Sequence, residues 1–237
     1  MSYGVIVDVE TTGLNCEEDK IIEIALLKFS LGTEPNIISL YSELEDPCEP
    51  ISPEIQKLTH LTTELLQGTK IDWAKVKKDL DGASVVIAHN MEFDRSFLRK
   101  RSELEGLEVH WACSLNHIDW YKHGFKTRSL NYLASDHGFI NPFAHRALFD
   151  CATTFRLITP YLKELLAKSH EVEYELLASN SPFKSKDSLK ERGYRWNPEK
   201  RVWFKRIFEK ELEEETVFLK EHVYNGKDLS EKIRVSE

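Results

Sequence analysis

Two acidic residues stand one residue apart near the start of the chain, in the segment GVIVDVETTGLN at residues 4–15. A run of Val and Ile leads into Asp8 and Glu10, and the apolar pattern breaks directly after them. Side chains two residues apart on a β-strand point to the same face, which would put these carboxylates ~6.5–7 Å apart. Such like charges resist burial unless divalent cations lie between them. Taken alone, the pair is also explained by a solvated strand end.

Three further residues that can bind metal or move protons follow later in the chain. Asp94 comes just after an apolar run in VVIAHNMEFD, and the segment AHRALFD carries His145 and Asp150. Each of these motifs lies where a strand is expected to end or a helix to begin. Sites in α/β proteins assemble from such ends at one edge of a sheet. We therefore expect four carboxylates and one imidazole to meet in a single pocket.

Apolar runs and turn residues predict the elements that would position these groups. The expected strands are residues 4–9, 20–30, 36–44 and 84–90. The expected helices are residues 52–68 in two pieces that begin at Ser52 and Thr62, then 72–82, 92–106, 129–138 and 145–168. The last of these is expected to bend before Pro160. Three strands followed by alternating helix and strand predict an α/β architecture with a mixed sheet.

A smaller pattern follows a change of composition near residues 169–183. It consists of a helix ending at Gly193, a hairpin that turns at Asn197, and an acidic helix ending at Gly226. The sequence therefore predicts a main domain at residues 1–170 and a small α+β module at 171–237.

Composition limits the class of protein. The chain has 237 residues, 41% of them apolar, and a formal net charge of −8. The acidic balance argues against a protein that coats duplex nucleic acid through a broad basic face. The sequence shows neither a long apolar span nor a secretory signal, so no membrane association is expected. The four cysteines form no C-x-x-C pair and are expected to be reduced, which favours a cytoplasmic location.

The order D-x-E, N-x-x-x-D and H-x-x-x-x-D resembles the DEDD superfamily of 3′→5′ exonucleases, and the third motif resembles its histidine subclass. That subclass includes the proofreading epsilon subunit of bacterial replicative polymerase, ribonuclease T, oligoribonuclease and exonuclease ten. The likeness covers roughly residues 3–168 through VDVETTGLN, IIEIALL, IQKLTHLT, VVIAHNMEFDRSFL, SLNYLA and HRALFDCATTFRLI. It implies a ribonuclease-H-like fold, with a five-stranded mixed sheet flanked by helices.

The resemblance implies a role for each acidic residue of the three motifs. The metal ligands that it implies are Asp8, Glu10, Asp94 and Asp150. All-oxygen ligands suit Mg²⁺ or Mn²⁺, and two such ions ~3.5–4 Å apart can clamp the attacking and leaving oxygens of a phosphodiester. His145 would be the general base that takes a proton from the attacking water. An ordinary surface or helix-opening histidine is the alternative interpretation.

The resemblance also implies a set of substrate contacts. The segment that receives the terminal nucleotide in the family corresponds to Thr11, Thr12, Gly13 and Leu14. His60 stands where the family presents a histidine towards the terminal sugar, Asn90 would orient the site, and Phe93 would stack on a base. For all seven residues, a turn, a structural role or core packing is the alternative.

Basic and aromatic residues interleave in residues 183–206, FKSKDSLKERGYRWNPEKRVWFKR. Nine basic residues stand against three acidic ones, which gives this stretch a net charge of +6. Such interleaving is typical of single-strand binding through phosphate contacts and base stacking. However, a module of ~65 residues needs large aromatic side chains for its core. Alternation along the hairpin accordingly predicts that Trp196 and Trp203 are buried.

The leading hypothesis is a metal-dependent 3′→5′ exonuclease that releases nucleoside 5′-monophosphates from single-stranded or frayed DNA. One alternative is a 3′→5′ exoribonuclease that trims RNA or short oligonucleotides, because sugar selection depends on the shape of the pocket around the 2′ position. Another is a catalytically idle nucleic-acid-binding or polymerase-associated module. The expected partners are DNA or RNA 3′ ends, with a polymerase or another nucleic-acid enzyme as a further candidate.

Overall fold

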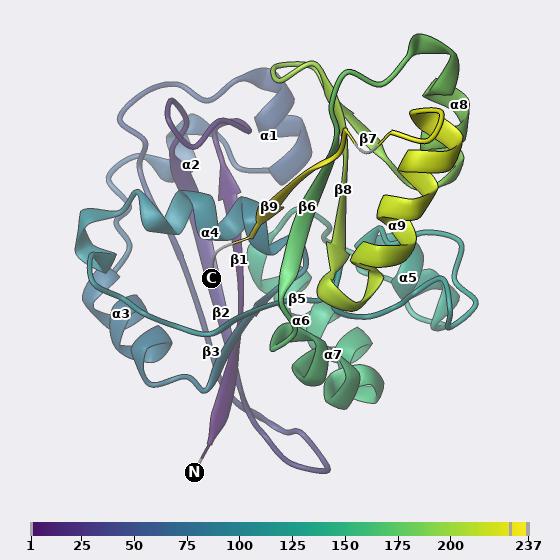
Figure 1. Ribbon diagram of the computed structural model, residues 1–237. Coiled ribbons are helices and arrows are strands. Elements are labelled where there is room, and N and C mark those ends of the chain that lie inside the picture. The colour runs from purple at the N-terminus through teal and green to yellow at the C-terminus, as the bar shows by residue number, and fades with distance from the viewer. Residues whose placement is uncertain (1, 228, 236–237) are drawn as a thin grey trace. The chain divides into compact units, whose positions relative to one another are not determined.

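A computed structural model describes residues 2–227 and 229–235 of the chain (Figure 1). It contains two compact units, Met1–Ser169 and His170–Glu237. The division between them lies next to the boundary expected at residue 170.

The first unit is built on a five-stranded mixed sheet with the order β3-β2-β1-β4-β5. Its first three strands are antiparallel, whereas β4 and β5 run parallel to β1. The strands are β1 Tyr3–Thr11, β2 Ile21–Ser30, β3 Ile37–Leu44, β4 Val85–Ala88 and β5 Trp111–Cys113. This sheet, flanked by helices, confirms the ribonuclease-H-like α/β class. The short β5 had no counterpart among the strands predicted from the apolar pattern.

The helices of the first unit follow the predicted pattern with shorter bounds. They are α1 Pro53–Thr59, α2 Thr63–Leu66, α3 Trp73–Asp81, α4 Met91–Arg99, α5 Leu130–Asp136, α6 Ala147–Ile158 and α7 Leu162–Ser169. The hydroxyls of Ser52 and Thr62 accept hydrogen bonds from the first turns of α1 and α2. The predicted helix at 145–168 is divided into α6 and α7 by a 3₁₀ turn that contains Pro160.

Helices cover both faces of β1, the central strand. Val5, Val7 and Val9 belong to the buried cluster that includes α3 and α4, whereas Ile6 belongs to the cluster that includes α6 and α7. Because side chains alternate along a strand, Asp8 and Glu10 share the face of Ile6. Both acidic residues therefore lie on the side of the sheet that α6 covers.

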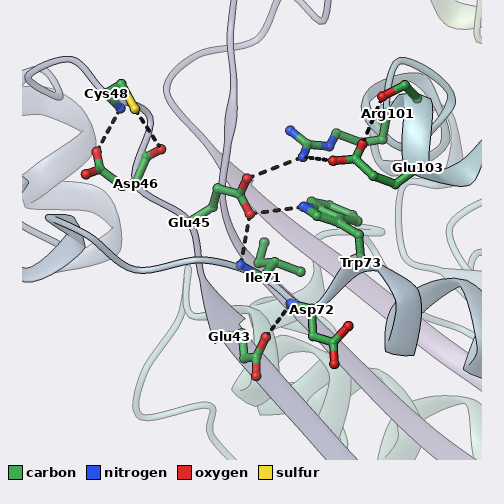
Figure 2. A network of polar contacts seen from close by, with 10 residues as sticks. Glu43, Glu45, Asp46, Cys48, Ile71, Asp72, Trp73, Arg101 and Glu103 are labelled. Carbon is green, nitrogen blue, oxygen red and sulfur yellow. Dashed lines mark hydrogen bonds and ion pairs between the residues drawn. The ribbon is translucent and has the colours of Figure 1, made fainter.

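A partly buried carboxylate connects three segments of the first unit (Figure 2). Glu45, just after β3, accepts hydrogen bonds from the Ile71 backbone N–H, from Trp73 Nε1 and from Arg101 Nη2 at 3.0, 3.0 and 3.3 Å. The Arg101 guanidinium also lies 4.3 Å from the centre of the Trp73 ring. Glu103 contacts the same guanidinium from a more exposed position.

Replacing Glu45 with alanine is expected to lower the free energy of unfolding of this unit by about 2–4 kcal/mol, because buried N–H donors lose their acceptor. Urea denaturation followed by circular dichroism measures the change. Glu103→Ala is the matched control, and its effect should stay within about 0.5 kcal/mol because the lost ion pair is solvated. Equal, small effects of the two variants would show that the network does not hold the segments together.

The second unit has a four-stranded sheet with the order β7-β8-β6-β9. Its strands are β6 Glu173–Ala178, β7 Arg195–Asn197, β8 Val202–Phe208 and β9 Glu231–Arg234. Helices α8 Lys186–Glu191 and α9 Leu212–Phe218, with the π-helix Leu219–Val223, complete it. The predicted hairpin and both helices are present, whereas β6 and β9 were not predicted.

The two hairpin tryptophans differ in burial. Trp203 on β8 is 9% exposed and packs in the core of the unit, as predicted. Trp196 on β7 is 47% exposed, so the prediction that it is buried was wrong. Trp196 is exposed because β7 is an edge strand of the sheet and has a neighbouring strand on one side only.

Candidate active site

Asp94 is tied to the backbone between the two acidic residues of β1. The strand β4 pairs with β1 only along Gly4–Ile6, so β1 continues past its parallel neighbour. The freed N–H of Val9 donates to Asp94 Oδ1 at 3.1 Å, and Asp94 is buried in the first turns of α4. The N-x-x-x-D spacing thus places a carboxylate beside the end of β1.

His145 and Asp150 are joined by a hydrogen bond that spans the start of α6. The His145 backbone N–H donates to Asp150 Oδ2 at 3.0 Å, and Asn141 Nδ2 donates to Asp150 Oδ1 at 2.5 Å. His145 has a φ of 61°, in the left-handed region that non-glycine residues rarely adopt. The thiol of Cys151 contacts the carbonyl oxygens of Ile6 and Ala25, which holds α6 against the sheet.

The structure brings three of the five predicted site residues into one close group. One potential ligand atom each from Glu10, His145 and Asp150 lies within 4.8 Å of the others. Among the described residues, Asp8 and Asp94 fall outside this group. Both residues remain electrostatically coupled to the group, because the charges of Asp150 and Glu10 raise the pKa of Asp8, and the charge of Asp94 raises the pKa of Glu10.

Burial and mutual repulsion raise the pKa of all four carboxyl groups. Burial, followed by the neighbouring acidic charges, raises the pKa of Glu10 to about 8 and that of Asp8 well above its usual value. Burial is likewise the largest cause for Asp94 and Asp150, whose pKa values rise to about 7 and about 6. The positive charge of Arg146 offsets the upward shift of the Glu10 pKa only in part, and the oxygen donors of the cluster suit Mg²⁺ or Mn²⁺. The residues therefore fit a divalent-cation site.

The thermal stabilisation produced by Mn²⁺ is expected to grow as the pH rises from about 5.5 to about 8. Glu10 has a folded-state pKa above its unfolded value of ~4.3, so its contribution to stability is complete below pH ~4 and is lost as the pH rises towards about 8. Cations compete with protons for the carboxylates, so bound Mn²⁺ restores the stability lost at high pH. Each kcal/mol of restored stability should raise the melting temperature by about 2–4 °C. Differential scanning fluorimetry with and without Mn²⁺ measures this, and an increase independent of pH would contradict it.

A further buried carboxylate, which was not among the predicted site residues, lies beside Glu10. Glu23 on β2 is directly opposite Glu10 in the sheet and is 1% exposed. It accepts hydrogen bonds from Arg146 Nε and Nη2, and from the Ala147 backbone N–H at 3.1 Å. The ion pair thereby fixes the residue that follows His145 and the start of α6. The sequence signal was a lone glutamate in the apolar strand IIEIALL, which requires a buried partner.

The turn after β1 carries the predicted nucleotide-contacting segment. The Thr11 hydroxyl donates to the Gly13 carbonyl oxygen, and Thr12 Oγ1 accepts from the Lys20 N–H. A Cβ at Gly13 would lie 2.5 Å from the Asp19 carboxylate oxygens, so any other residue here would displace that side chain. Leu14 projects into solvent and is 87% exposed. Contact of these four residues with a nucleotide stays a prediction.

The three other predicted contacts occupy different local environments. His60 is exposed and ends α1 with a φ of 60°, which gives it a structural role as the cap. Asn90 is the exposed residue at the N-terminus of α4, and its side chain makes no capping hydrogen bond. Phe93 is partly buried, with its ring centre 4.9 Å from that of Phe97. Their roles towards substrate also stay predictions.

Comparisons with known proteins point to one family. The model of the RNase_T family, described as exonuclease, matches residues 5–158. The PolC-type DNA polymerase III of Streptococcus suis (strain 98HAH33) is 31% identical over 187 residues, which cover 75% of this chain and 13% of the polymerase. This chain therefore corresponds to a small part of that relative.

Solved structures show the same fold at lower sequence identity. Exonuclease X in complex with 5′ overhanging duplex DNA is 22% identical, with a TM-score of 0.53 over 70% of this chain and 99% of the other. The nuclease domain of 3′hExo, a DEDDh family member bound to rAMP, is 18% identical, with a TM-score of 0.54 over 69% of this chain and 92% of the other.

Proposed function

Because the chain belongs to the RNase_T exonuclease family, we propose that it is a metal-dependent 3′→5′ exonuclease that removes nucleotides from single-stranded or frayed DNA. The observation that supports this most is the approach of Glu10, His145 and Asp150 within 4.8 Å, beside the buried Asp94 and the partly buried Asp8. A structural role alone does not account for so many raised carboxyl pKa values at one end of a sheet.

The four carboxylates are the groups that would hold two divalent cations, Mg²⁺ or Mn²⁺. When bound, the cations neutralise phosphate charge and lower the pKa of the attacking water. Asp94 and Asp150 are held by the hydrogen bonds of Val9, His145 and Asn141, so their oxygens need little reordering. Preorganised charge of this kind acts on the transition state at small cost.

His145 is the proposed general base. Its ring is exposed, and partial desolvation lowers its pKa, so the neutral form that accepts a proton dominates at pH 7. The imidazole takes a proton from water as the oxygen attacks phosphorus. The bond from phosphorus to the 3′ oxygen breaks, and a proton reaches that oxygen. The products are a nucleoside 5′-monophosphate and a strand shortened by one nucleotide.

DNA is the proposed substrate, and RNA is the second candidate. The PolC-type relative is a DNA polymerase, which favours DNA. The structure of 3′hExo bound to rAMP shows that the same fold also accepts a ribonucleotide, which favours RNA.

Association with a polymerase is a further proposal that rests on the PolC-type relative. A cytoplasmic location is proposed because all four cysteines are free thiols. No helix among the described residues is long and apolar enough to cross a bilayer.

Strands of matched sequence, one of DNA and one of RNA, test both the reaction and the sugar preference. Each carries a 5′ label and is incubated with Mg²⁺, with Mn²⁺ or with EDTA. We expect a ladder of shortened, labelled DNA that requires a divalent cation, and slower cleavage of RNA. Faster cleavage of RNA would favour the exoribonuclease, and release of a labelled mononucleotide would mean the opposite direction. Cleavage of neither strand would support the idle module.

A further inference from the structure

Charge is strongly segregated within the second unit. Residues 183–206 have a net charge of +6, although the whole chain has a net charge of −8. Structurally, this stretch includes α8, the edge strand β7 and most of β8, while α9 carries Glu213, Glu214 and Glu215 in its first turn. The basic residues are thus concentrated in three consecutive elements of the unit.

Four exposed basic side chains of this stretch have no ion pair or side-chain hydrogen bond with any residue in 2–227 or 229–235. They are Lys184, Lys190, Arg195 and Arg201. By contrast, Arg192 and Lys205 both pair with Glu215. Exposed cations without internal partners remain available to an anionic ligand.

Trp196 follows Arg195 in the edge strand β7 and presents an exposed aromatic surface. It is 47% exposed and is supported by Trp203, with ring centres 5.6 Å apart. The hairpin tip next to it is fixed, because Asn197 Oδ1 accepts from the N–H groups of Glu199 and Lys200 at 3.0 and 2.9 Å. Arg201 completes the turn with a φ of 51°, a costly conformation for arginine. A ring supported by Trp203, on a hairpin whose turn is fixed, suits stacking on a flat ligand.

We propose that α8 and the β7–β8 hairpin bind single-stranded nucleic acid at the free edge of their sheet, with a base stacked on Trp196 on one face and phosphates held by Arg201 at the turn and by Arg195 across the edge. An aromatic ring accepts any base, and cations follow the backbone, so the surface binds without a strong sequence preference. The proposal does not depend on nuclease activity, because its residues belong to the second unit alone. The surface is complementary in charge to a polyanion, and the exposed ring of Trp196 favours a polyanion with unstacked bases.

The test measures the affinity of the full chain carrying Asp8→Asn for a fluorescent oligothymidylate with a blocked 3′ end, in EDTA. Trp196→Ala is expected to weaken binding about 5- to 150-fold, and Trp196→Phe should restore most of the affinity. Arg195→Ala with Arg201→Ala should lower the slope of log affinity against log salt by about 1.4. The matched control, Lys220→Ala with Lys227→Ala, makes the same charge change on exposed residues of the same unit and should leave the slope unchanged.

Three outcomes would overturn the proposal. Unchanged affinity of Trp196→Ala, with the fold verified by circular dichroism, removes the stacking role. An equal slope for the two double variants means that net charge alone matters. Competition by polyglutamate as strong as that by unlabelled oligothymidylate means that the surface binds polyanions, or acidic protein segments, in general.

A parallel measurement with oligouridylate shows whether RNA is the ligand, and tighter binding of either strand supports the surface. Because cations are absent and the 3′ end is blocked, none of these results depends on the proposed cleavage.

Discussion

Replacement of Asp8 with asparagine is expected to abolish nucleotide release almost completely while leaving the metal-free protein as stable as before, or more stable. The substitution removes a ligand from the cation site. Loss of several kcal/mol of transition-state stabilisation corresponds to a decrease in rate of about 10³-fold or more. Stability changes in the opposite direction, because the charge of Asp8 is desolvated and is repelled by Asp94, Asp150, Glu10 and Glu23. A neutral amide of the same shape avoids that repulsion.

Initial rates on labelled single-stranded DNA and melting temperatures in EDTA at about pH 8 measure the two effects. Asp136→Asn is the matched control, since Asp136 is an exposed residue of α5 and the chemical change is identical. The control should retain both rate and melting temperature. A stable Asp8→Asn variant with full activity would show that this carboxylate takes no part in catalysis. A large decrease in its melting temperature would instead give Asp8 a structural role.

The sequence indicated which residues would lie near one another, because charge in an apolar strand or at a helix start is a strong signal. Asp8 and Glu10 interrupt a buried strand, and the D-x-E spacing alone fixes their common face. The H-x-x-x-x-D spacing also has a local cause, since the His145 backbone N–H donates to Asp150. The mutual approach of Glu10, His145 and Asp150 is a tertiary property, and the structure was needed to measure it.

Three other features were not predicted from the sequence, each for a different physical reason. The strand β5 has only three residues, too few for a recognisable period. Trp196 alternates correctly for burial, but the sequence does not reveal that its strand lies at a sheet edge. Glu23 looked like part of an apolar strand, and its partner Arg146 is more than a hundred residues away. Long-range pairs of this kind depend on the topology of the fold.

The Glu23–Arg146 pair explains how an exposed histidine can be held in one place. His145 is exposed and has a left-handed backbone, two features that normally accompany mobility or strain. The segments before and after it are fixed, because the side chain of Asn141 donates to Asp150 and the side chain of Arg146 donates to the buried Glu23. The imidazole can therefore face the carboxylates while remaining accessible to water and substrate. A base that must receive a proton and release it to solvent needs both properties.

Replacement of His145 with glutamine is expected to lower the rate constant of the chemical step by about 10²- to 10⁴-fold, because the proton acceptor is lost. The rate of the unchanged enzyme should rise with pH as the imidazole loses its proton, and then level off. The pKa of His145 is lowered by partial desolvation, so this rise should occur below pH ~6.5. The variant should lose this step in the pH profile, and a profile that retains it would assign the titration to the carboxylates instead.

His145 also lies close enough to Glu10 and Asp150 to bind a cation, so the measurement must separate a base from a ligand. The Mn²⁺ concentration that gives half of the maximal thermal stabilisation provides this separation. A general base leaves that concentration nearly unchanged in His145→Gln, whereas the loss of a ligand raises it at least tenfold. His123→Gln is the control, because His123 is partly exposed and bonds Glu164 elsewhere in the same unit. A slow enzyme with unaltered Mn²⁺ affinity would support the general base, and weakened affinity would make His145 a metal ligand.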